Sequence, residues 1–168
     1  MVLGLSLATF TLLHVLISLV GIVAGLIAMA GLLKSNPMRQ WTALFLITTI
    51  LTSVTGFFFP VDKLLPSHVI GIISLVLLAI ACVALYGRKL NGSWRWIYVV
   101  TAMTSLYLNV FVLIIQSFLK VPPLHALAPS VPPSAPPFAI VQVIVLIAFL
   151  AVTVMAIRKF RPLSGRFA

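Results

Sequence analysis

Five long apolar segments alternate with short polar or proline-rich segments along the 168-residue chain. Each has about the 20 residues that cross about 30 Å of hydrocarbon, at a rise of about 1.5 Å per helical residue. Because lipid offers no hydrogen-bond partners, each segment must satisfy its own backbone amides, which a helix does. The pattern therefore predicts an all-α transmembrane helix bundle. Its five spans are expected at residues 9–33, 41–59, 67–87, 96–119 and 138–157.

The composition supports hydrocarbon as the solvent of this chain. Hydrophobic residues make up 62% of it and charged residues only 7%, whereas soluble domains have about 25% charged residues. So few charges cannot coat a water-exposed surface. The length suits one compact bundle, so a single transmembrane domain is expected over residues 1–168.

Basic residues gather on one side of the predicted bundle. The net charge is +10, and the only acid is Asp62. The other side has only Lys63 and Lys120. By the positive-inside rule the amino terminus lies outside and the carboxyl terminus in the cytoplasm. Anionic lipid head groups account for this charge better than nucleic acid does. The basic residues after the first, third and fifth spans are Lys34, Arg39, Arg88, Lys89, Arg95, Arg158, Lys159, Arg161 and Arg166.

Prolines dominate the loop at residues 120–137, on the predicted outer side. It contains seven of the eleven prolines. Proline removes a backbone donor and clashes with the preceding helical turn. This segment is therefore expected to be non-helical, forming either an extended, partly polyproline strap or a plain linker.

Small and polar residues indicate how the helices associate. Gly21 and Gly25 form a GxxxG pattern, which favours close helix packing and self-association of the chain. On the fourth span a polar stripe contains Thr101, Ser105 and Asn109, between Tyr98 and Gln116. The spacing keeps these residues on one helical face, so Asn109 is expected to point into the bundle. The stripe serves either interhelical contacts or a polar path or ligand contact.

Ionisable and amide side chains are predicted at one depth near the outer boundary. His14 and His68 each lie twenty residues before the basic end of their span, with Gln116 and Gln142 near that level. Two such histidines could bind a b-type haem, or a histidine and a glutamine a quinone. Three imidazoles, those of His14, His68 and His125, could instead bind copper or zinc. The alternative is that they simply reach toward interfacial water.

Several catalytic chemistries lack their residues in this sequence. Neither a glycine-rich phosphate loop nor a G-x-S-x-G or H-E-x-x-H motif is present. Cys82 is a lone cysteine within an apolar segment. The sequence therefore favours a protein that is not an enzyme.

Several motifs resemble those of a group of small, uncharacterised bacterial inner-membrane proteins. They are TSVTGFFFP at residues 52–60, LLPSHVIG at 64–71, WRWIYV at 94–99 and NVFVLIIQSFLKVPP at 109–123. The resemblance implies a multi-pass protein of the bacterial inner (cytoplasmic) membrane. It implies no activity, ligand or residue role.

Two functional hypotheses follow from the sequence. One is a haem- or quinone-binding subunit associated with redox chemistry, which uses the outer histidine and glutamine layer. The other is a non-enzymatic protein, either an accessory or assembly subunit or a small transporter. The partners expected are the lipid bilayer and a larger membrane complex or further copies of the chain.

Overall fold

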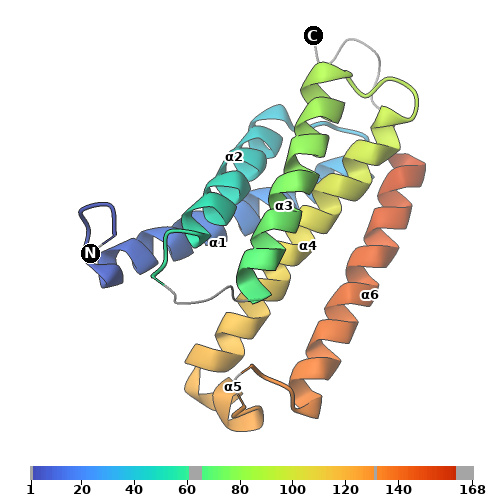
Figure 1. Ribbon diagram of the computed structural model, residues 1–168. Helices are drawn as coiled ribbons and strands as arrows, with labels where there is room; N and C mark the ends of the chain where they lie inside the picture. Colours follow the sequence, from blue (N-terminus) through green and yellow to red (C-terminus); the bar gives the residue numbers. More distant parts are fainter. Residues whose placement is uncertain (1, 61–65, 131, 162–168) are drawn as a thin grey trace.

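The structure, a computed structural model, describes residues 2–60, 66–130 and 132–161. Its regular elements in these ranges are all helices (Figure 1), which confirms the predicted all-α class. The five long helices match the five apolar segments to within a few residues. In chain order the elements are α1 (Leu7–Leu33), α2 (Arg39–Gly56), α3 (Pro66–Cys82), the π-helical turn η1 (Val83–Gly87), α4 (Trp94–Lys120), α5 (Pro122–Leu127) and α6 (Pro136–Lys159).

Four of these helical segments are long and apolar enough to cross a membrane. They are Leu7–Leu33, Ser67–Gly87, Trp94–Lys120 and Pro136–Lys159. The remaining long helix, α2, does not meet the same criterion, although five spans were predicted. It has 18 residues, begins with Arg39 and Gln40, and contains five threonines.

Long helices that follow one another in the chain run in opposite directions, so their ends meet in two groups. At one end, the Arg95 Nη1 atom donates to the carbonyl oxygens of Ile157 and Phe160, at 2.8 and 2.6 Å. At the same end, the Arg161 amide donates to Ser35 Oγ at 2.7 Å. The turns after α1 and η1 and the end of α6, which hold most of the basic residues, therefore lie together. Asp62, Lys63 and Arg166 lie outside the described residues.

Aromatic rings and histidines meet at the opposite end of the bundle. His14 of α1 contacts Thr55 in the last turn of α2. Phe118 of α4 packs edge-on against Phe138 of α6, with ring centroids 5.4 Å apart. Figure 1 shows α5 at this end and the last turn of α6 at the other. The histidines and these phenylalanines thus lie at the end of the bundle opposite the basic turns.

Helix α4 is the centre of the bundle. It contacts all the other helices, whereas α6 packs mainly against α4 and α1. Its inward face buries Val99, Met103 and Leu106 almost completely. By contrast, α6 is the least buried of the four apolar helices. Its outward face of valine, isoleucine and leucine suits contact with lipid, which packs as well on these side chains as protein does.

The prediction that residues 121–137 are non-helical is wrong for Pro122–Leu127, which form α5. Pro122 and Pro123 occupy its first turn, where the missing amide is not needed and the fixed φ favours a helix. Val121 before them is extended, as the residue before proline prefers. Pro136 and Pro137 begin α6 in the same way. Proline therefore starts helices here rather than preventing them.

The GxxxG face of α1 packs inside the bundle. A methyl group at Gly25 would lie 2.5 Å from Leu106 Cδ1 and 2.8 Å from Phe45 Cδ2. Gly21 likewise faces side chains of α2 and α4. Both glycines are buried by other helices of the same chain. The sequence indicated self-association through this face, but the face is not free for it.

Candidate functional site

Polar side chains from three helices converge on Gly21 in the middle of the bundle. A methyl group there would lie 3.0 Å from Thr48 Oγ1, 3.2 Å from Thr49 Oγ1 and 3.6 Å from Asn109 Nδ2. Gly21, Thr48 and Asn109 each lie within about two residues of the middle of their helix. We call Ser18, Thr48, Thr49 and Asn109 the midplane cluster. Only glycine on α1 lets these side chains approach so closely.

One hydrogen bond ties α1 to α4 across the midplane cluster. The Ser18 hydroxyl donates to Asn109 Oδ1 at 2.9 Å. This contact confirms that Asn109 points into the bundle. The Nδ2 group of the same amide, also buried, has no hydrogen-bond partner.

Thr49 differs from the other threonines of α2. The hydroxyls of Thr48, Thr52 and Thr55 each donate to the carbonyl four residues earlier, and that of Thr42 donates to Pro37. These bonds satisfy a hydroxyl within its own helix or turn. Thr49, which is 2% exposed, makes no such bond, and its Oγ1 atom has no partner. The midplane cluster thus presents two buried polar atoms that no group in the described part of the chain satisfies.

His14 lies one helical turn outward from Ser18 on the same face of α1. Its Nδ1 atom is 2.8 Å from Thr55 Oγ1, and its ring packs edge-on against Phe59. The side chain is half-buried. Polar groups therefore continue from the midplane cluster toward the aromatic end of the bundle.

His68 and His125 are held by other groups. His68 is buried, and its ring lies against Phe57 with centroids 5.5 Å apart. His125 Nδ1 lies 3.2 Å from the Phe118 carbonyl oxygen. Throughout the described ranges, no three His, Cys, Asp or Glu side chains are grouped to bind a metal ion. The proposed copper or zinc site of His14, His68 and His125 is therefore not assembled there.

The two glutamines of the predicted outer layer have different surroundings. Gln116 is exposed, so it does not join the buried stripe of Thr101, Ser105 and Asn109. Gln142 is 8% exposed, and its Nε2 group donates to the Phe111 carbonyl at 3.3 Å while its Oε1 has no partner. Among the described residues, no hydrogen bond joins either amide to an imidazole. A haem b or quinone site built from these residues stays a prediction.

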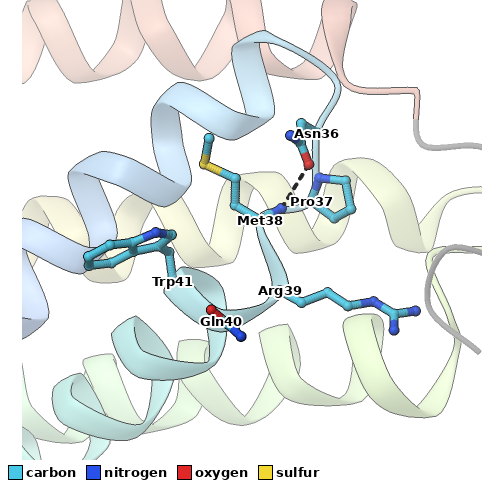
Figure 2. A pocket seen from close by; sticks show the side chains of 6 residues that line it. All are labelled: Asn36, Pro37, Met38, Arg39, Gln40 and Trp41. Carbon is cyan, nitrogen blue, oxygen red and sulfur yellow. Dashed lines mark hydrogen bonds between the residues drawn. The ribbon is translucent and has the colours of Figure 1, made fainter.

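A surface hollow of about 540 Å³ lies at the basic end, on the turn between α1 and α2. Figure 2 shows that Arg39 and Trp41 point away from each other there. Asn36 Oδ1 is occupied by the Met38 amide, which donates to it at 3.2 Å. One stretch of chain, residues 36–41, lines the whole hollow. Because its polar groups do not converge, we place the candidate site at the midplane cluster instead.

Comparisons of this chain with known protein families, with curated proteins and with solved structures find no match. The class of protein is therefore defined by its own fold and candidate site. The protein is all-helical over the described residues, and four helices are long and apolar enough to cross a membrane. Its most unusual feature is the buried polar cluster between α1, α2 and α4.

Sequence reasoning singled out Asn109 but missed the residues that meet it. Ser18 is the only one of the cluster on α1, and no charge or motif marks it. The available signal was its spacing, because Ser18 lies four residues after His14 and three before Gly21. Those intervals place all three on one helical face.

Proposed function

We propose that the chain is a five-span protein of the bacterial inner membrane that binds and passes a small polar solute at the midplane cluster. Its amino terminus lies outside and its carboxyl terminus in the cytoplasm. The orientation is supported by the basic residues that share one end of the bundle, because cytoplasmic loops are rich in lysine and arginine.

Helix α2 is the fifth span in this proposal. At 18 residues it is about 27 Å long, close to the thickness of the hydrocarbon core. Four of its five threonine hydroxyls donate to backbone carbonyls, so they expose little unsatisfied polarity to lipid. Its buried face packs against the glycines of α1. These features let a threonine-rich helix reside among apolar ones.

Labelling of an introduced cysteine tests the orientation. Asn91 is exposed in the turn between η1 and α4. In a Cys82→Ser background, we expect Asn91→Cys to react with a membrane-impermeant maleimide only after the cells are opened. The unsubstituted Cys82→Ser chain is the background control. Labelling of intact spheroplasts would place this turn outside and refute the orientation.

The observation that supports solute binding is the pair of unpartnered atoms, Thr49 Oγ1 and Asn109 Nδ2. Buried polar atoms in proteins are nearly always hydrogen-bonded, and an unsatisfied one costs about 1–3 kcal/mol. Here one atom that can accept and one that can donate lie near the same glycine, at mid-depth in the bundle. Many transporters bind their substrates near the membrane midplane.

Permeability of reconstituted liposomes tests this function. We expect the protein to raise glycerol or urea permeability, measured by stopped-flow light scattering, above that of empty liposomes. Asn109→Leu removes the amide and should lower this protein-dependent rise in permeability by at least about tenfold. The reason is that the hydrogen bond to the solute and the hydrogen bond to Ser18 are both lost. The matched control, Asn91→Leu, changes an exposed amide and should leave the increment intact.

The same measurement separates the transporter from an accessory or assembly subunit. If the wild-type protein leaves glycerol and urea permeability at the empty-liposome value, the transport proposal fails. A wild-type increment that Asn109→Leu preserves would show that the midplane cluster is not the path.

A further inference from the structure

The hydrogen bonds around His14 define which ring nitrogen bears the proton. The Thr55 hydroxyl has one hydrogen, and it points at backbone carbonyls: Oγ1 lies 2.7 Å from the Leu51 oxygen and 3.2 Å from the Thr52 oxygen. Carbonyl oxygens only accept. Thr55 Oγ1 must therefore accept from His14, which makes Nδ1 the protonated nitrogen of the neutral ring. The Nε2 lone pair is left as an acceptor.

We propose that His14 Nε2 forms the outer binding position of the solute path and accepts a hydrogen bond from the solute. This inference rests on the proposed function. Thr55 acts as a positioning residue, since its bond fixes the tautomer and the ring. Phe59, packed edge-on at 5.1 Å between centroids, limits rotation of the same ring.

The two positions together define a class of solute. His14 presents an acceptor, and Asn109 presents an N–H donor beside Gly21, two helical turns deeper along α1. A solute that fits both has a hydroxyl or amine hydrogen and a lone pair, as polyols and amides have. Such a solute exchanges one set of bonds for the next as it moves inward.

The solute is expected to be uncharged. Lys120 is the last residue of α4, at the same end of the bundle as His14, so its positive charge would repel a cation at this entrance. An anion would be attracted there, but the midplane cluster contains only hydroxyl and amide groups. A charge without a counter-charge is expensive at this depth. We therefore infer selection of small neutral molecules over acetate or ammonium-type ions.

Nitrogen NMR of the full-length protein in nanodiscs tests the tautomer without any transport measurement. With ¹⁵N-labelled histidine, we expect the wild-type His14 ring to show a protonated Nδ1 and an unprotonated Nε2. Thr55→Val removes the acceptor and should give a mixture of tautomers. A wild-type ring protonated on Nε2 would overturn the inference, even if every variant failed to fold.

Liposome permeability then tests the binding role. His14→Phe keeps a flat ring but removes the acceptor, and we expect about a tenfold lower glycerol or urea increment. The matched control, His125→Phe, changes an imidazole that contacts a backbone carbonyl in another part of the chain and should leave the increment unchanged. Acetate permeability should stay at the empty-liposome value.

The outcomes distinguish the two proposals. If Asn109→Leu abolishes the increment and a folded His14→Phe does not lower it, only the outer binding position is refuted. If neither glycerol nor urea crosses faster with the wild-type protein, the proposed function itself fails. An acetate increment equal to that of glycerol refutes the selection of neutral solutes.

Discussion

Replacing Gly25 with valine should lower the free energy of unfolding by about 3 kcal/mol, the upper part of the usual range for overpacking. A first added carbon would already lie 2.5 Å from Leu106 Cδ1 and 2.8 Å from Phe45 Cδ2. Both side chains are buried, with 1% and 2% exposure, so they have little room to move. Helices α1, α2 and α4 would have to separate at their contact, which also opens the midplane cluster.

Unfolding of the purified protein by SDS, followed by circular dichroism, measures this loss. Gly87→Val is the matched control, because the nearest atom to a methyl group there is Val83 Cγ1 at 3.8 Å. We expect the control to change the unfolding free energy by less than about 0.5 kcal/mol. Equal effects at the two glycines would contradict close packing at Gly25.

Gly31→Ala is the second substitution with a large expected effect, about 2–3 kcal/mol. Its methyl group would lie 2.6 Å from the Asn36 carbonyl oxygen, a backbone atom that cannot rotate away. The Asn36 amide also donates to the Gly31 carbonyl at 2.9 Å, which folds the turn back over the end of α1. Alanine would force this turn open and shift the start of α2.

Thermal unfolding in detergent should show a lower midpoint for Gly31→Ala than for the wild type. Alanine normally stabilises a helix relative to glycine, by reducing the entropy of the unfolded chain. Gly87→Ala, which meets no close contact, should therefore be neutral or stabilising. An unchanged midpoint in Gly31→Ala would show that the turn is not packed against this glycine.

The positions of the long helices could be predicted because hydrocarbon imposes one length and one polarity on every span. The four apolar helices and α2 begin and end within a few residues of the predicted segments. Helix α2 is the exception, because it does not meet the criterion of length and apolarity that the other four helices meet. Four of its five threonine hydroxyls donate hydrogen bonds to backbone carbonyls, which lowers the cost of placing them in an apolar environment. These hydrogen bonds are seen only in the three-dimensional structure.

Gln116 shows why a helical face does not by itself predict burial. It lies seven residues after Asn109 and therefore on nearly the same face of α4. Burial also requires a neighbouring helix at that height. Helix α2 ends at Gly56, about two turns beyond Thr48 and Thr49, and in Figure 1 the first half of α1 diverges from α4. At the level of Gln116 that face is no longer covered.

The partners within the site could not be predicted from local pattern. Ser18 and Asn109 are 91 positions apart, and His14 and Thr55 are 41 apart. Their pairing depends on the tilt and order of three helices. The one local clue was Gly21 with Gly25, a pattern that indicated close helix packing and also self-association of the chain. Within a single chain, the same small residues serve the packing of α1 on α2 and α4.

The threonine-rich character of α2 has a consequence for biogenesis. A segment that opens with Arg39 and Gln40 and carries six side-chain hydroxyls partitions poorly from the translocon into lipid when it is alone. Helix α1 is synthesised first, and its face with Gly21 and Gly25 offers a surface against which α2 can pack. In the proposed five-span topology, the two helices would therefore insert as one hairpin. A chain from which α1 has been deleted should then leave α2 at the bilayer surface.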